Sequence, residues 1–107
     1  MAVLKLIPPQ RAVELMRQGA LLVDIREPQE HAQERIAGAK LHPLSSFSAN
    51  APVASGNDAV IYHCRSGTRT LVNADKLGAA APGEAYVMEG GIEAWKAAGL
   101  PVETGAK

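Results

Sequence analysis

The chain has 107 residues, of which 47% are hydrophobic and 21% are charged. This length suits a single domain, 1–107, and the composition is typical of a globular protein rather than a disordered or fibrous one. Basic and acidic residues number 11 each, so no net charge is available to hold nucleic acid. Any anion-binding site must therefore be local.

Cys64 is the single cysteine, so no disulfide can form within the chain, and its free thiol suits a reducing compartment. The short N-terminus runs directly into Pro8 and Pro9 and lacks the features of a secretory signal. Apolar runs such as 21–23 and 59–62 fall far short of the roughly 18 residues of a membrane-spanning helix. We therefore expect a cytoplasmic chain that does not span a membrane.

The predicted elements begin with a strand over residues 4–7 and a helix that Pro9 opens and that runs to Arg17. The run 21–25 is apolar at successive positions, the pattern of a strand covered on both sides in a parallel sheet. The polar segment 28–34 predicts a short helix. The chain therefore opens by alternating strands and helices.

A brief strand is predicted over 39–41, and the segment 43–57, without clear periodicity, predicts a surface loop. Residues 59–63 form the clearest buried strand, and they lead directly into the loop 64–70. A helix begins within that loop and ends before Pro82.

Three- and four-residue spacing places Leu71, Ala74, Leu77 and Ala81 on the buried face of this helix. The last predicted elements are a strand over 84–88, a turn at Gly90-Gly91, a helix over 92–98 and a final edge pairing at Val102.

Such alternation predicts an α/β fold with a mostly parallel sheet and helices on both faces, because parallel neighbours need a crossover. In such sheets the ligand crevice lies outside the carboxyl ends of the strands. The chain places 24–26, 63–64 and 89–91 there. Cys64 thus lies where a site is expected.

The loop after Cys64 has three features that favour a thiolate. A strand ends before the sulfur and a helix begins after it, so unpaired N–H groups can converge there. Gly67 permits a tight turn that aims these groups inward. Arg65 and Arg69 add positive charge, with no acid between Asp58 and Asp75 to cancel it, so the loop is predicted to be a local cationic pocket. A buried, inert cysteine would need none of these neighbours, so we predict a nucleophile.

The segment Cys64-Arg65-Ser66-Gly67-Thr68-Arg69 resembles the active-site loop of the rhodanese family, whose domains carry sulfur on a cysteine. Residues 23–30 resemble the family's first motif, and 90–102 its last. The stretch 35–39 departs from the usual His-Ile-Pro-Gly-Ala. The segment 63–77 most resembles the rhodanese domain of a bacterial inner-membrane sulfurtransferase whose chain continues into a membrane anchor. The resemblance leaves open whether this chain is the cytoplasmic domain of such an anchored protein.

The resemblance implies a three-layer α/β/α fold with roughly five strands in the central sheet. It also implies a thiosulfate sulfurtransferase, EC 2.8.1.1, in which Cys64 takes sulfur as a persulfide from a donor such as thiosulfate. A thiophilic acceptor, cyanide or a thiol, then receives that sulfur. No metal or organic cofactor is expected. The predicted substrate-binding residues are Arg65, Ser66, Gly67, Thr68, Arg69 and Thr70.

Two other functions stay open. His63-Cys64 with a downstream arginine is also similar to cysteine phosphatases and arsenate reductases, but their pattern would place the arginine at position 70, where this chain has Thr70. The rhodanese fold also occurs as a binding or regulatory module without activity.

Several other residues have plainer interpretations. His31, His42 and His63 lack the paired spacing of metal sites. We expect Trp95 to be a core anchor. Asp24 and Arg26 suit a scaffold ion pair as well as a substrate contact.

Overall fold

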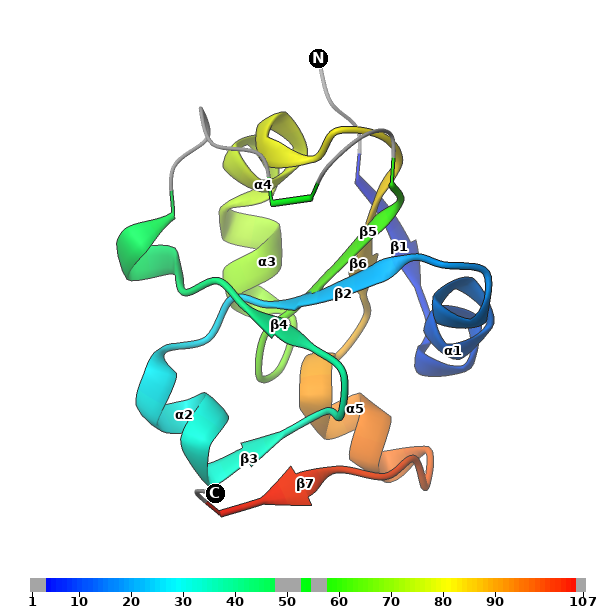
Figure 1. Cartoon of the computed structure of the whole chain (residues 1–107), viewed down its shortest axis with the longest axis vertical. Coiled ribbons are helices and arrows are strands. Elements are labelled where there is room, and N and C mark those ends of the chain that lie inside the picture. Colours follow the sequence, from blue (N-terminus) through cyan, green and yellow to red (C-terminus); the bar gives the residue numbers. More distant parts are fainter. Residues whose placement is uncertain (1–3, 48–52, 55–57, 106–107) are drawn as a thin grey trace.

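The computed structural model of the chain describes residues 4–47, 53–54 and 58–105. Its centre is a parallel five-stranded sheet with the strand order β1-β6-β5-β2-β4 (Figure 1). The strands are β1 (Leu4–Ile7), β2 (Leu21–Asp24), β4 (Lys40–Leu41), β5 (Val60–His63) and β6 (Ala85–Met88). The structure confirms the predicted α/β class and the parallel sheet.

Helical segments connect these strands, as parallel neighbours require. They are α1 (Pro9–Arg17), α2 (Pro28–Gln33), the 3-10 turn η1 (Leu44–Ser46), α3 (Thr68–Val72), α4 (Ala74–Ala80) and α5 (Gly91–Ala97). In α1, proline occupies the first helical position, where its missing N–H leaves no hydrogen bond unmade. None of the helices in the described part of the chain is long and apolar enough to cross a membrane.

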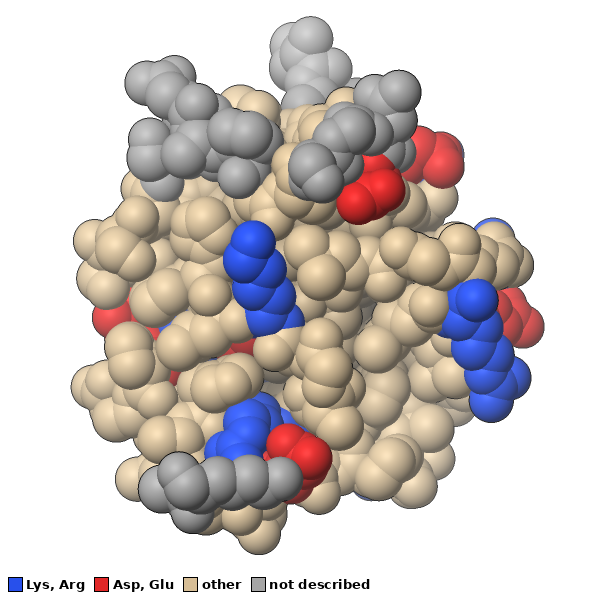
Figure 2. Space-filling view, in the orientation of Figure 1, with Lys and Arg blue, Asp and Glu red and all other residues tan. Residues whose placement is uncertain are grey.

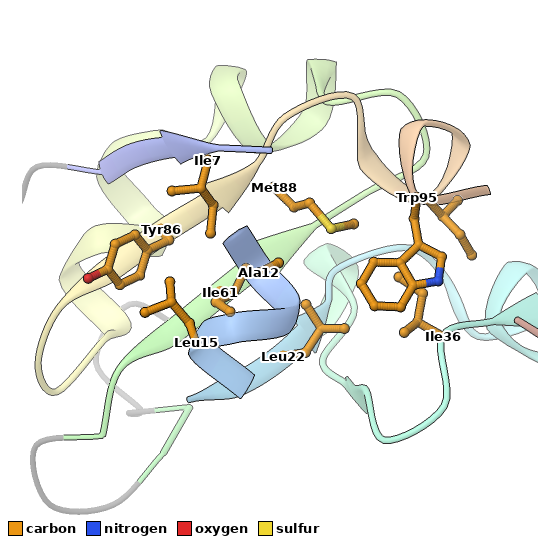
Figure 3. Packing of buried hydrophobic residues seen from close by; sticks show 10 residues of the cluster. Ile7, Ala12, Leu15, Leu22, Ile36, Ile61, Tyr86, Met88 and Trp95 are labelled. Carbon is orange, nitrogen blue, oxygen red and sulfur yellow. The ribbon is translucent and has the colours of Figure 1, made fainter. Parts of the chain in front are cut away.

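One face of the sheet packs against α1 and α5. Leu22, Ile61 and Met88 project from the strands into this layer, which is shown in Figure 3. Trp95 on α5 is 4% exposed, and its indole N–H donates to the Pro101 carbonyl at 2.8 Å. The predicted role of Trp95 as a core anchor is therefore confirmed.

The opposite face packs mainly against α4. Val60 and Tyr62 project from β5 into this second cluster, together with Leu77 of α4. The Tyr62 hydroxyl donates to the Leu77 carbonyl at 2.7 Å, which satisfies a polar group that would otherwise be buried unpaired. Because β5 is covered on both sides, all four of its residues are buried, which explains its continuous apolar sequence.

The predicted helix after Cys64 is in fact two helices, α3 and α4, which meet at Asn73. The Asn73 side-chain amide donates to the Arg69 carbonyl at 2.8 Å and so ends α3. The axis changes there, and a single helical face no longer runs through both parts. Leu77 is buried as predicted, but the prediction for Leu71 is wrong, because that residue is 56% exposed.

The segment 43–57 is not simply a surface loop, although residues 48–52 and 55–57 lie outside the described part. Phe47 and Val53 are buried in the cluster on the α4 side of the sheet. The ring of Phe47 lies 6.3 Å from that of Tyr62, in an edge-on arrangement. The low periodicity of this segment concealed two core residues.

The C-terminal strand also differs from the prediction. β7 (Glu103–Thr104) pairs antiparallel with β3 (Glu34–Arg35) in a separate two-stranded ribbon, so the pairing begins one residue after the predicted Val102. The Arg35 guanidinium reinforces this ribbon by donating to the Gly105 carbonyl at 2.9 Å. In Figure 1 the ribbon lies at the opposite end of the molecule from the N-terminus.

Candidate active site

The carboxyl ends of β2, β5 and β6 lie side by side, and the segments that follow them are joined by hydrogen bonds. The Ile25 N–H donates to the His63 carbonyl at 3.1 Å, and the Ile92 N–H donates to the Cys64 carbonyl at 2.9 Å. The structure thus brings together the three segments that the sequence predicts at this edge.

The Cys64 sulfur lies inside a tight turn between β5 and α3. It accepts a hydrogen bond from the Gly67 N–H at 3.1 Å, and the residue is 1% exposed. Gly67 has φ of 100°, in the left-handed region that glycine adopts without steric penalty. The Thr70 hydroxyl donates to the Gly67 carbonyl at 2.7 Å and lies 3.8 Å from the sulfur. These contacts fold the loop back over Cys64.

Fewer backbone N–H groups of the loop point at the sulfur than predicted. Among the described residues, Gly67 is the one backbone N–H that donates to the sulfur. In the same part of the chain, no protein acceptor pairs with the N–H groups of Arg65, Ser66, Thr68 or Arg69. Several donors of the loop are therefore available to a bound anion.

The start of α5 holds the loop from the side. In addition to the bond from Ile92, the Glu93 N–H donates to the Arg65 carbonyl at 3.1 Å. The close approach depends on Gly91, where a β-carbon would overlap the Cys64 carbonyl oxygen. Two otherwise unpaired N–H groups at this helix end thus fix the backbone beside the cysteine.

The two arginines of the loop are not free positive charges, so that part of the prediction is wrong. The Arg65 Nε donates to Glu93 at 3.1 Å in an exposed ion pair. Arg69 binds both carboxylate oxygens of Glu30, at 2.7 and 2.8 Å. The partners come from α5 and α2, which the sequence near the loop does not reveal. The loop is therefore a set of ion pairs rather than an uncompensated cationic pocket.

A buried ion pair lies beneath the site. Arg26 donates from Nη2 to Asp24 at 2.8 Å and to the Glu34 carbonyl at 2.6 Å, and His31 Nδ1 lies 3.0 Å from Asp24. Burial, the largest single effect, opposes ionisation of Asp24, but the hydrogen bonds from Arg26 and His31 and the nearby His63 together outweigh it and lower the pKa of the carboxyl to about 2. Of the two roles considered, these contacts favour the scaffold over substrate contact for Asp24 and Arg26.

His63 is completely buried beside the cysteine. Burial lowers the pKa of this histidine, so its ring is neutral near pH 7. Its Nδ1 lies 3.2 Å from the Cys64 carbonyl oxygen, so Nδ1 carries the proton and donates it. Its Nε2 has no partner among the described residues and lies 4.0 Å from Asp24. His63 thus adds a second donor to the carbonyl that Ile92 already binds.

The loop separates two clefts. A polar cleft of about 200 Å³ is lined by Arg26, Glu30, Glu34, Arg65, Glu93 and Lys96. A more apolar cleft of about 180 Å³ is lined by Ser66, Gly67, Thr68, Leu6, Leu71 and Val87. In the view of Figure 2, basic and acidic side chains are scattered among neutral ones, and the visible face carries no large patch of one sign.

The predicted site residues therefore lie in one loop but differ in exposure. Cys64, Gly67 and Thr70 are buried, Arg69 is half-buried, and Arg65, Ser66 and Thr68 are exposed. In the described part of the chain, no three His, Cys, Asp or Glu side chains are grouped as a metal site.

Sequence reasoning missed Glu30 and the clamp formed by Gly91 and Ile92. Glu30 falls within the segment 23–30 that resembles a family motif, but nothing in its spacing pointed to Arg69. The pairing spans 39 positions along the chain.

Comparison with known proteins agrees with this geometry. The sequence profile described as the rhodanese-like domain matches residues 8–98. The chain belongs to the rhodanese-like domain family.

The chain is 36% identical over 108 residues to thiosulfate sulfurtransferase GlpE of Pseudomonas putida, covering 97% of this chain and 94% of the relative. It is 35% identical over 107 residues to GlpE of Pseudomonas fluorescens, with the same coverage. These relatives support a GlpE-like member of the family, and not the membrane-anchored member that the finer resemblance predicts.

The fold is shared with a rhodanese-related protein from Thermoplasma volcanium. The TM-score is 0.78 at 23% identity, and the match covers 92% of this chain and 97% of that one. At this identity the likeness establishes the three-layer fold and the topology alone.

Proposed function

We propose that this chain is a thiosulfate sulfurtransferase in which Cys64 is the nucleophile. The observation that carries the proposal is the Gly67 N–H placed 3.1 Å from the sulfur, in a loop with further unpaired donors. A backbone N–H stabilises an anionic sulfur better than a neutral thiol, since hydrogen bonds to charged acceptors are the stronger ones. Relatives with full-length similarity carry the same activity in their names.

The reaction has two displacement steps. The Cys64 thiolate attacks the outer sulfur of thiosulfate, a sulfur–sulfur bond forms to the enzyme, and the bond to the sulfonate breaks to release sulfite. The outer sulfur of the enzyme persulfide is then attacked by cyanide, which leaves as thiocyanate, or by a thiolate, which leaves as a new persulfide. Each attack returns an electron pair to sulfur, so the enzyme needs no redox cofactor.

The loop residues have separate roles in this scheme. The unpaired N–H groups of Arg65, Ser66, Thr68 and Arg69 bind the sulfonate oxygens of the donor. The Thr70 hydroxyl is close enough to exchange its bond with the Gly67 carbonyl for one with the sulfur. Because Cys64 is 1% exposed, the donor reaches the sulfur through an outward movement of the exposed part of the loop.

Mass spectrometry of the intact protein tests the nucleophile. After exposure to thiosulfate, the wild type should gain one sulfur, about 32 Da, and lose it on addition of a thiol. Cys64→Ser should show no gain and no detectable thiocyanate formation, while its unfolding temperature stays close to that of the wild type. Sulfur transfer by a folded Cys64→Ser protein would refute the assignment, and an unmodified wild type would favour the binding module.

The phosphatase alternative is disfavoured by Thr70. The position at which that class needs an arginine holds a buried hydroxyl that donates to the Gly67 carbonyl. A phosphate group would lack the guanidinium that binds its oxygens. Hydrolysis of an aryl phosphate without any transfer of sulfur would reverse this preference.

We further propose that residues 1–107 act as one domain, with a small sulfur-containing anion as donor and a thiol, on a small molecule or a protein, as acceptor. The single unpaired cysteine supports action in the reducing cytoplasm.

A further inference from the structure

Glu30 places a fixed negative charge against Arg69 of the loop 64–70, the cysteine loop. Both of its carboxylate oxygens are bonded to Arg69, at 2.7 and 2.8 Å, and each side chain of the pair is about one-third exposed or less. The hydrogen bonds from Arg69 lower the pKa of Glu30 to about 2. The carboxylate is therefore ionised throughout the physiological range.

The carboxylate is also held from its own helix. Glu30 Oε1 accepts the Glu27 N–H at 3.0 Å, as part of the capping box that begins α2. Rotation of Glu30 away from Arg69 would break this bond as well as the bidentate pair. The pair is therefore more fixed than the exposed contact between Arg65 and Glu93, which has one bond and is screened by solvent.

Arg69 is the loop cation that this arrangement affects. Arg69 belongs to the loop itself and precedes Thr70, whose hydroxyl lies 3.8 Å from the Cys64 sulfur. A divalent anion bound in the loop must either share Arg69 with Glu30 or displace Glu30 from it. In the first case the charge of one guanidinium is divided between two anions, and in the second the Glu30 carboxylate loses its partner, so both cases weaken the binding of the anion.

We propose that Glu30 is a specificity-determining residue that acts through Arg69 and weakens the binding of small divalent anions at Cys64. The inference rests on the proposed function and concerns the donor thiosulfate and the product sulfite, both of which carry two charges. By holding Arg69, Glu30 keeps the affinity for both ions low. Sulfite then leaves readily, and the loop stays open to an incoming thiolate, which is also an anion.

Steady-state kinetics of Glu30→Gln tests the proposal. Glutamine retains the volume and a carbonyl oxygen for the Glu27 N–H but removes the charge. The KM for thiosulfate and the inhibition constant for sulfite should each fall about fivefold, the effect of one charge in a partly screened site, while kcat stays equal or decreases. An unchanged or higher KM would overturn the inference.

Glu34→Gln is the matched control. Glu34 lines the same polar cleft, has the same 29% side-chain exposure as Glu30, and is paired with Lys96 at 2.8 Å. The two variants therefore change the net charge equally, but only one removes the partner of Arg69. A KM change of less than twofold is expected for Glu34→Gln. An equal fall of the KM in both variants would show that the effect comes from the net charge of the protein and not from the partner of Arg69.

A second background tests whether Glu30 acts through Arg69. In Arg69→Gln protein, the further change Glu30→Gln should no longer lower the KM for thiosulfate, because the cation that it releases is absent. A full fivefold fall in that background would contradict the mechanism. A Glu30→Gln protein that fails to fold would show a structural role instead and would also overturn the inference.

Alkylation of Cys64 tests this inference independently of the proposed sulfur transfer. Glu30→Gln should increase the rate with iodoacetate, an anion, about fivefold relative to the rate with neutral iodoacetamide. An unchanged ratio would overturn the inference and leave the sulfur transfer standing. A folded wild type that reacts with neither reagent would have an unreactive thiol and would overturn both.

Discussion

Gly91 shows how little space separates the cysteine loop from the start of α5. Its φ of 61° is in the left-handed region, and a β-carbon there would lie 2.6 Å from the backbone of Arg65. Neither backbone segment can move without breaking the bonds from Ile92 and Glu93. The position therefore excludes every residue except glycine for two independent reasons.

We predict that Gly91→Ala destabilises the protein by more than about 3 kcal/mol, because it combines backbone strain with a backbone clash. Any folded fraction should transfer sulfur poorly, since the loop is displaced. The measurement is urea unfolding combined with the thiosulfate assay. Gly99→Ala is the control, because Gly99 has φ of 81° but open space around it, so the cost should be about 1 kcal/mol. An equal loss of unfolding free energy in the two variants would show that the backbone clash at Gly91 does not contribute.

At this scale, sequence reasoning identified the loop that holds Cys64 but not the electrostatic surroundings of that loop. Cys64 and Gly67 stand out because their residue types and spacing are local. The carboxylates that pair with Arg65 and Arg69 lie 28 and 39 positions away along the chain, so only the folded structure brings them together. For the same reason, the expected cationic pocket was wrong.

Among the elements, Arg26 connects β2 and β3 at the base of the site. Its guanidinium bonds to Asp24 on β2 and to the carbonyl of Glu34 on β3, and the side chains of Asp24 and Arg26 are 0% and 4% exposed. A buried charge that loses its partner is costly, whereas removing both charges together is much less so.

This ion pair gives a prediction for a double-mutant cycle. Arg26→Met should destabilise the fold by about 3 kcal/mol, because the Asp24 carboxylate stays buried without its main partner. Asp24→Asn in the same protein should cost less than it does in the wild type, by at least about 1 kcal/mol. Urea unfolding of the four proteins measures the coupling. Additive costs would show that the pair is not energetically coupled.

The three inner strands were predictable because β2, β5 and β6 are buried along almost their whole length and therefore read as apolar runs. The helix break at Asn73 was not predictable, because the three- and four-residue spacing of apolar residues continues past this asparagine. In the structure, its side chain bonds to the Arg69 carbonyl and ends α3. Phe47 and Val53 were also missed, since isolated core residues in a polar segment leave no periodic signal.

For the molecule as a whole, acid should weaken the fold through the carboxylates that it holds ionised. Glu30 has a pKa of 4.5 when unfolded and about 2 when folded, so its contribution is fully present above pH 4.5 and is lost as the pH falls towards 2. We predict that Glu30→Gln is less stable than the wild type by about 2 kcal/mol at pH 7, after allowance for solvent screening, and that the difference falls to less than half at pH 3.

Urea unfolding of the wild type and Glu30→Gln at several pH values checks this. The loss of stability due to Asp24 occurs in both proteins and cancels in the comparison. A difference that does not change between pH 7 and pH 3 would mean that the charge of Glu30 does not stabilise the fold.

The hydrogen bonds between α5 and the cysteine loop also determine at what stage of chain synthesis the site can form. Synthesis delivers Cys64 well before Ile92 and Glu93, so the growing chain holds the thiol for a time without the two amides that shape its backbone. A chain interrupted before α5 carries the cysteine but lacks the two N–H groups that bond to the backbone of Cys64 and Arg65. The backbone geometry around Cys64 is thus complete only when α5 has folded against the loop, and an unfinished polypeptide carries the thiol without that support.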